Sequence, residues 1–114
     1  MTGAQLTAEI QLALATGDCR LWRNQVGKYH LADGRWISSG LAVGSADLIG
    51  IKSVTVTKEM VGKKIGVFLS VEVKGQGDKP TTKQTAWRDM VRELGGIACI
   101  ARNVEEAKNE TTKS

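Results

Sequence analysis

Apolar and polar side chains alternate along residues 65–74, and this alternation is the clearest local pattern in the chain. Because successive side chains of a strand point to opposite faces, the pattern predicts a strand in which Glu72 and Lys74 share one face. Phe68 and Ser70 complete that face. The opposite face consists of Val67, Leu69, Val71 and Val73.

Two other segments have the longer period of an amphipathic helix. Thr2 and Gln5 match a capping box, and Gly17 supplies a stop signal. The apolar stripe of this first helix consists of Leu6, Ile10 and Ala13. A second helix is predicted over residues 82–94, after Thr81 and before two glycines. Its inward positions are Trp87, Met90, Val91 and Leu94.

Short apolar segments predict the remaining strands. They cover residues 19–22, 28–37, 48–57 and 97–101, with a tight turn at Asp33 and Gly34. Asn103 is expected to cap a short last helix, and the polar tail over residues 109–114 is expected to fray. This order predicts an α/β (α+β) fold, a mixed central sheet flanked by helices. The length of 114 residues predicts one domain over residues 1–114.

The composition narrows the class of protein. No apolar run approaches the roughly 20 residues of a membrane-spanning helix. The N-terminus has no basic region followed by an apolar stretch, so we expect a cytoplasmic protein. Cys19 and Cys99 belong to no metal-binding spacing, and we interpret them as small buried residues and expect no zinc site.

The formal net charge of +4 conceals an uneven distribution. Between Arg20 and Arg92 there are thirteen Lys or Arg residues against six Asp or Glu residues. A positive field draws in the phosphate backbone of nucleic acid. Many basic proteins bind no nucleic acid, so the charge supports such a partner only together with a site.

The pair of Glu72 and Lys74 allows two interpretations. A Glu and a Lys two positions apart are most often a solvated pair that adds little stability. If residues 67–73 form an interior strand, however, charges on its other face need a partner or a ligand. Asp47 adds a second carboxylate in a segment of small residues whose backbone permits close approach. Two carboxylates beside an ammonium group offer oxygen ligands for a divalent cation, which favours water attack on phosphate.

Taken in order, these residues resemble a known family. The pattern comprises Gly44-x-x-Asp47-Leu48, Glu72-Val73-Lys74, Gln84, and Gly95-Gly96 before a short apolar strand, preceded by Leu21-Trp22-Arg23-Asn24-x-x-Gly27. It is similar to the PD-(D/E)xK nuclease superfamily and, within it, to the stand-alone VRR-NUC domains of phages and bacteria, over most of the chain. Ala46 stands where the family usually has Pro. Since that Pro shapes the backbone and is not a ligand, the departure casts little doubt on metal binding.

The resemblance implies a fold and an activity. The expected fold is a restriction-endonuclease-like core with the element order αβββαβ. The expected activity is metal-dependent hydrolysis of DNA phosphodiester bonds by a structure-selective endonuclease, similar to a Holliday junction resolvase that acts as a homodimer. The alternatives are a flap or duplex DNA nuclease and, from another class, a catalytically idle DNA-binding module.

The resemblance also implies roles for individual residues. Asp47 and Glu72, with the backbone carbonyl of Val73, would bind Mg²⁺ or Mn²⁺. Lys74 would orient the attacking water or stabilise the developing negative charge. Gln84 would hydrogen-bond the water or the scissile phosphate.

Two of the candidate residues have competing explanations. Several nucleases of this superfamily place a metal-linked Glu on the first helix, and Glu9 falls within its apolar stripe, but a Glu at the edge of the stripe also reaches solvent. Gln84 resembles the polar site residue of the family, but it also completes a capping box with Thr81.

The basic and aromatic residues before Asp47 are candidates for contact with DNA. Candidate backbone contacts are Arg20, Arg23, Lys28 and Arg35. Trp22 and Trp36 neighbour these arginines and are open to base stacking, whereas Trp87 is expected in the core. His30 has no nucleophile pattern near it and is interpreted as structural.

Overall fold

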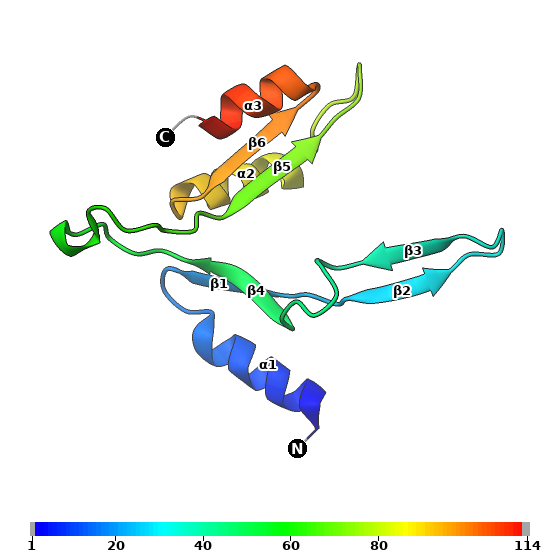
Figure 1. Cartoon of the computed structure of the whole chain (residues 1–114), viewed down its shortest axis with the longest axis horizontal. Coiled ribbons are helices and arrows are strands. Elements are labelled where there is room, and N and C mark those ends of the chain that lie inside the picture. The colour runs from blue at the N-terminus through cyan, green and yellow to red at the C-terminus, as the bar shows by residue number, and fades with distance from the viewer. Residues whose placement is uncertain (1, 113–114) are drawn as a thin grey trace. The chain divides into compact units, whose positions relative to one another are not determined.

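The computed structural model describes residues 2–112, and their contacts divide the chain into two compact units. The first unit is Met1–Lys52 and the second is Ser53–Ser114. Figure 1 traces the order of the elements along the chain. No helix among residues 2–112 is long and apolar enough to cross a membrane.

The first unit is built on an antiparallel pair of strands. β1 (Cys19–Arg23) runs beside β4 (Leu48–Lys52), with Cys19 opposite Lys52 and Arg23 opposite Leu48. Gly50 lies opposite Leu21, and a Cβ atom at Gly50 would collide with the backbone carbonyl of Arg20. This close approach explains why a glycine occupies the middle of a strand.

Helix α1 (Gly3–Leu14) begins with the predicted capping box and contacts β1 through its polar side. Gln11 Nε2 donates a hydrogen bond of 2.9 Å to the Leu21 carbonyl. The predicted apolar stripe is exposed, and the half-buried positions of the helix include Thr7 and Gln11. The prediction that Leu6, Ile10 and Ala13 face inward is therefore wrong, because the helix contacts β1 through the amide group of Gln11 and not through these apolar side chains.

A two-stranded hairpin extends away from β1 and β4 within the first unit (Figure 1). β2 (Gly27–His30) pairs antiparallel with β3 (Trp36–Ser39). The predicted turn lies at the hairpin tip, where Gly34 has a φ of 92°. Asp33 accepts hydrogen bonds from the backbone N–H and the Nε of Arg35, at 3.0 and 2.7 Å. The tip is therefore ordered by its own charged pair.

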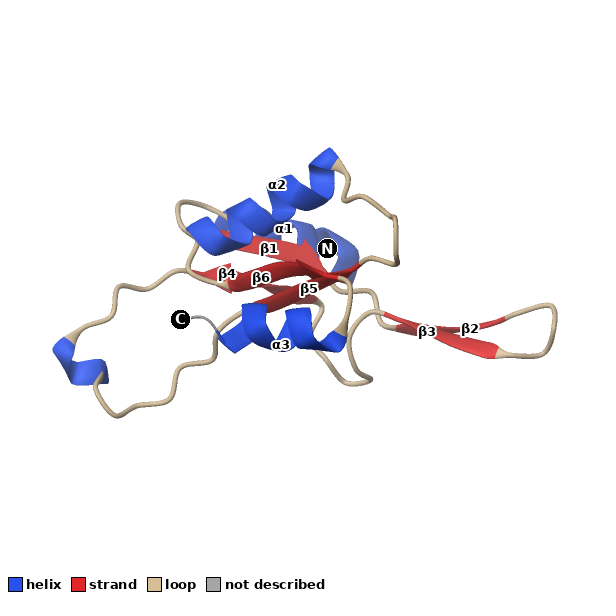
Figure 2. Cartoon of the chain, turned by 90° about the horizontal axis from the view of Figure 1, so that it is seen from above, coloured by secondary structure: helices blue, strands red, loops and turns tan. Residues whose placement is uncertain are grey.

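The second unit is a parallel strand pair between two helices. β5 (Leu69–Val73) pairs with β6 (Ile97–Ala101), and α2 (Thr82–Glu93) and α3 (Val104–Thr112) lie on opposite faces of the pair (Figure 2). The buried core of this unit consists of Val91, Ala98, Cys99 and Ala101. Apolar residues on β6 and on the inner side of α2 thus exclude water between the layers.

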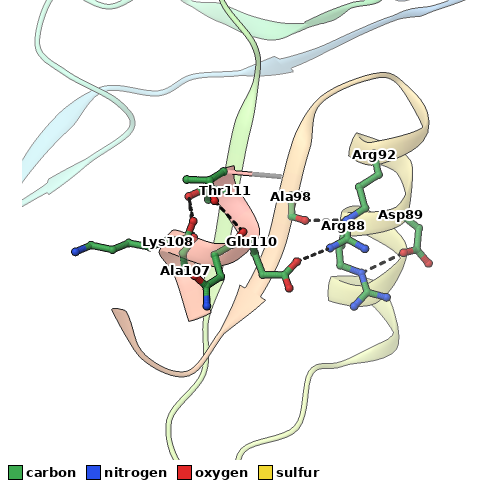
Figure 3. Close-up of polar contacts among 10 residues, drawn as sticks. Arg88, Asp89, Arg92, Ala98, Ala107, Lys108, Glu110 and Thr111 are labelled. Carbon is green, nitrogen blue, oxygen red and sulfur yellow. Dashed lines mark hydrogen bonds and ion pairs between the residues drawn. The ribbon is translucent and has the colours of Figure 1, made fainter. Parts of the chain in front are cut away.

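One arginine joins three elements of the second unit. Figure 3 shows Arg92 of α2 directed toward β6 and α3. Its Nε donates a 2.9 Å hydrogen bond to the Ala98 carbonyl, and its Nη2 lies 3.6 Å from Glu110 Oε2. The cation therefore satisfies a strand carbonyl and pairs with a carboxylate on the last helix.

The structure corrects several predicted boundaries. The strands predicted over residues 48–57 and 65–74 are shorter, and a 3₁₀ helix, η1 (Lys58–Met60), lies between β4 and β5. The tail predicted to fray from residue 109 is helical as far as Thr112, where α3 ends, while residues 113–114 lie outside the described part. The mixed helix and strand class is confirmed. Residues 2–112 form three small sheets of two strands each, together with three α-helices.

Candidate active site

Strand β5 fixes the candidate residues of the second unit. Ser70 and Glu72 are half-buried, whereas the residues between and beside them are exposed, as expected for alternating faces. The N–H of Lys74 donates a 3.0 Å hydrogen bond to the Ala101 carbonyl, which continues the ladder one residue beyond β5. The prediction that Glu72 and Lys74 share a face is confirmed.

The face of Glu72 is the side of β5 that α2 covers. Trp87 Nε1 donates a 2.8 Å hydrogen bond to Ser70 Oγ, and the rings of Trp87 and Phe68 meet edge to face at 6.4 Å. Trp87 therefore packs against the sheet, as predicted. The sequence predicted that the apolar face of this strand is buried. That prediction is wrong, because the apolar side chains of β5 are the exposed ones, with Val73 at 73%.

Glu72 has no partner among residues 2–112. No hydrogen bond or ion pair of its carboxylate is found there, and Lys74 is not within salt-bridge distance of it. A half-buried carboxylate without a partner is costly, whereas a solvated surface pair would leave both charges in water. Among residues 2–112, the two charges therefore do not form the direct ion pair that one interpretation of the sequence would allow.

The backbone of β5 adds an oxygen at the strand's open edge. The Phe68 carbonyl accepts a hydrogen bond from Ile97 N–H, and Lys74 N–H donates to Ala101, so both of these residues direct their backbone groups toward β6. Neighbouring residues of a strand direct theirs to the other edge, which places the Val73 carbonyl away from β6. Among residues 2–112, β5 pairs with β6 alone. This carbonyl is therefore available as a ligand.

Gln84 completes the capping box of α2. Its Oε1 accepts a 2.9 Å hydrogen bond from Thr81 N–H, and its own N–H donates to Thr81 Oγ1 at 3.1 Å. The structural explanation for Gln84 is thus present. Its side-chain amide nitrogen makes no hydrogen bond to residues 2–112, which leaves one donor for a site role.

Asp47 lies in the first unit, directly before β4, with an exposed side chain. The preceding loop turns at Gly40 and Gly44, whose φ angles are 76° and 87°. Asp47 and Arg23 line one pocket of about 390 Å³. Its other lining residues are Asn24, Gln25, Val26, Tyr29 and Ser45. A candidate carboxylate and a candidate DNA contact therefore open onto the same space.

Asn24 forms several hydrogen bonds with the loop that precedes Asp47. The sequence pattern assigned no role to this residue. Its Nδ2 donates hydrogen bonds of 2.8 Å to Ser45 Oγ and to the Ala46 carbonyl, and its Oδ1 accepts one of 2.9 Å from Leu41 N–H. Its backbone N–H donates to the Asp47 carbonyl at 2.8 Å. The available signal is its place in the Leu21-to-Gly27 stretch before Asp47.

The other candidates occupy varied surroundings in the first unit. Glu9 is exposed on α1. Arg20 donates to the carbonyls of Gly17 and Cys19, and Arg35 is paired with Asp33, so both guanidinium groups have structural contacts. Lys28 is exposed on β2.

The aromatic candidates differ in exposure. Trp36 is 66% exposed and its ring lies 4.8 Å from that of His30, whereas Trp22 is half-buried. Trp36 is thus the more accessible of the two proposed stacking residues. His30 is exposed beside it, rather than held in a core.

Comparison with known families places this site in context. The model of the VRR-NUC domain family matches residues 14–105. The chain belongs to the VRR-NUC family. VRR-NUC domains are nuclease domains of the PD-(D/E)xK-like superfamily, and DNA is their substrate. No curated protein and no solved structure matches the chain.

The VRR-NUC match spans parts of both units and includes Asp47, Glu72, Lys74 and Gln84, whereas Glu9 lies before it. Within residues 2–112, no group of three His, Cys, Asp or Glu side chains is gathered that could hold a metal ion. The candidate donors expected from the sequence are the carboxylate of Asp47 in the first unit, and the carboxylate of Glu72 and the carbonyl of Val73 in the second. Their oxygens suit Mg²⁺ or Mn²⁺ and are a poor match for metals that prefer sulfur or imidazole.

Proposed function

We propose that this VRR-NUC domain is a Mg²⁺- or Mn²⁺-dependent endodeoxyribonuclease that hydrolyses DNA phosphodiester bonds. The observation that supports the proposal most directly is the half-buried carboxylate of Glu72, which has no partner among residues 2–112 and shares a face with Lys74. In a chain of a nuclease family, such a carboxylate is best explained as a metal ligand.

The proposed ligands are Asp47, Glu72 and the Val73 carbonyl. A bound divalent ion supplies a more acidic water and neutralises charge on the phosphate oxygens. Glu9 is left outside the set, because it precedes the family match. It is retained as a candidate to be tested by substitution.

Lys74 and Gln84 act on the reacting atoms in this proposal. The oxygen of a water forms a bond to phosphorus and its proton passes to solvent, while the bond between phosphorus and the leaving oxygen breaks and that oxygen takes up a proton from solvent. The ammonium group of Lys74 orients the water or stabilises charge on the phosphate as it grows. The free amide N–H of Gln84 donates to the water or to the phosphate.

We further propose that the chain forms one domain with a restriction-endonuclease-like core and works in the cytoplasm. Its preferred substrate would be a branched DNA, most of all a four-way junction, cut by a homodimer whose two-fold symmetry matches two symmetric cuts. Arg20, Arg23, Lys28 and Arg35 would contact the phosphate backbone. A flap or duplex nuclease is the second candidate, because the residues of the proposed site do not read base edges.

The proposal is tested by cleavage of linear, flap and four-way DNA with Asp47→Ala and Glu72→Ala. We expect both variants to lose cleavage while they keep most of their DNA affinity, since affinity comes from the basic residues. Glu59→Ala, which removes an exposed carboxylate of the second unit, is the matched control and should cut normally. Wild-type cleavage by either site variant, in preparations free of contaminating nuclease, would refute the assignment.

Metal choice and assembly are measured in the same assay. Magnesium or manganese should support cleavage and calcium should support binding with little cutting, because calcium prefers longer and looser coordination. Full activity in excess chelator would exclude the metal hypothesis. Sedimentation at assay concentration tests the homodimer, and a monomer that cuts duplex and junction equally well would leave the nuclease in place and reject junction selectivity.

A further inference from the structure

Asn24 contacts the backbone on both sides of Asp47. Its side chain donates to the Ala46 carbonyl, which belongs to the peptide before Asp47, and its backbone N–H donates to the Asp47 carbonyl, which belongs to the peptide after it. These two peptide planes determine φ and ψ of Asp47. The direction of its Cα–Cβ bond is therefore fixed by one residue.

Two further hydrogen bonds hold Asn24 itself and the rest of the loop. Ser45 Oγ accepts from Nδ2, and Leu41 N–H donates to Oδ1, so three of the polar positions of the amide are used. Asn24 is half-buried, and its hydrogen bond to Ser45 Oγ is partly shielded from water, whereas those to Ala46 and Leu41 are exposed. The backbone of Asn24 is held in place by the neighbouring strand, because Asn24 directly follows β1.

The loop has few other restraints near Asp47. Ala46 has no ring to fix its φ, and the side chain of Asp47 is exposed. In the pocket that Asp47 and Asn24 both line, the carboxylate would otherwise sample several directions. The hydrogen bonds of Asn24 restrain the backbone from which the carboxylate projects, before any ion binds.

We propose that Asn24 is the positioning residue for Asp47: it preorganises the carboxylate for the divalent ion without touching the ion or the DNA. This inference rests on the proposed metal-dependent function. Residues that orient metal ligands through hydrogen bonds change metal affinity when they are removed. Asn24 should therefore act on metal binding and on turnover, and leave metal-independent DNA affinity unchanged.

The test compares Asn24→Ala with Ser45→Ala, Asp47→Ala and the control Asn109→Ala, which removes an exposed amide on α3. Manganese binding without DNA is measured by electron paramagnetic resonance, and DNA binding is measured in chelator. Cleavage is titrated with magnesium well below the unfolding temperature. Amide hydrogen exchange of Leu41 reports directly on the hydrogen bond to Oδ1.

We expect Asn24→Ala to need about 10–100-fold more metal for half-saturation, with a lower kcat and unchanged DNA binding in chelator. Excess metal should restore part of the cleavage, and Leu41 should exchange faster. Ser45→Ala, which keeps Asn24 but removes one of its acceptors, should change metal affinity in the same direction by less. Asn109→Ala should match the wild type.

Two outcomes separate this inference from the proposed function. If Asp47→Ala is inactive but Asn24→Ala binds manganese like the wild type, the positioning role is rejected and the nuclease assignment stands. If Asp47→Ala binds metal and cuts normally, the metal site itself is rejected. Should Asn24→Ala fail to fold, Ser45→Ala decides, because an unchanged metal affinity in that variant would overturn the inference.

Discussion

The two proposed metal-binding carboxylates are supported in different ways. Asp47 of the first unit lies at the end of a loop whose conformation depends on hydrogen bonds from Asn24. Glu72 of the second unit lies within a strand, paired with β6 and covered on its own face by α2. One carboxylate is therefore exposed and held through its backbone by polar contacts, and the other is half-buried and held by a ladder and a core.

This difference predicts which substitutions affect each carboxylate. A loop fixed by a few side-chain hydrogen bonds is sensitive to the loss of one polar atom. A strand fixed by a ladder and an apolar layer tolerates such losses and is sensitive to changes in packing. Charge removal at the two sites should also have unequal effects on stability, because only Glu72 loses solvent contact in the folded unit.

The largest effect is expected on the rate of cleavage, for two separate conservative substitutions, Glu72→Gln and Asp47→Asn. Each should reduce cleavage on the order of 10³-fold or more, since a metal ion contributes several kcal/mol to the transition state. Without metal, Glu72→Gln should raise the melting temperature, because an unpaired half-buried charge is removed, whereas Asp47→Asn should leave it unchanged. Equal melting temperatures for both variants would contradict the contrast in burial.

Gly50→Ala should destabilise the first unit selectively. Its Cβ would collide with the Arg20 carbonyl across the β1–β4 ladder, and such overpacking costs about 1–3 kcal/mol. Gly3→Ala, where a Cβ meets no atom within 4 Å, is the control and should be neutral or stabilising. Amide hydrogen exchange should accelerate in β1 and β4 and not in β5 and β6. Uniform acceleration over both units would show that they do not open independently.

A smaller effect separates the two roles of Gln84. Gln84→Glu keeps an oxygen for Thr81 N–H and so preserves the capping box, but it removes the free amide donor. We expect unchanged stability and a loss of cleavage on the order of tenfold, typical of one hydrogen bond to a charged group. Thr81→Ala should do the opposite and cost about 1 kcal/mol of stability with little change in cleavage. Normal cleavage by Gln84→Glu would show that Gln84 acts only as a part of the helix cap.

Local patterns in the sequence predicted several features of the fold. The capping boxes of α1 and α2, the hairpin turn at Gly34 and the last strand all follow from short-range signals. The common face of Glu72 and Lys74 follows from the period of a strand. These features depend on residues close together in the chain, which is why one sequence was sufficient.

Features that depend on distant partners were not predicted. The segments at residues 53–57 and 65–68 have strand-like composition but lie outside strands, because no partner strand among residues 2–112 extends the ladder along them. The stripe of α1 was placed inward, but spacing defines a face without stating what the face meets. The bonds from Asn24 to Ser45 and Ala46 cross more than twenty positions of the chain, and no local signal marks them.

The placement of the cysteines allows the motions of the two units to be followed by chemical labelling. Cys19 is a half-buried thiol in β1, and Cys99 is a buried thiol in β6. Reaction with a thiol reagent requires access to the sulfur, so the rate at Cys19 reports the separation of β1 from its neighbours and the rate at Cys99 reports the opening of the second unit. The natural protein thus contains one reporter in each unit, and peptide mass spectrometry distinguishes them without an engineered probe.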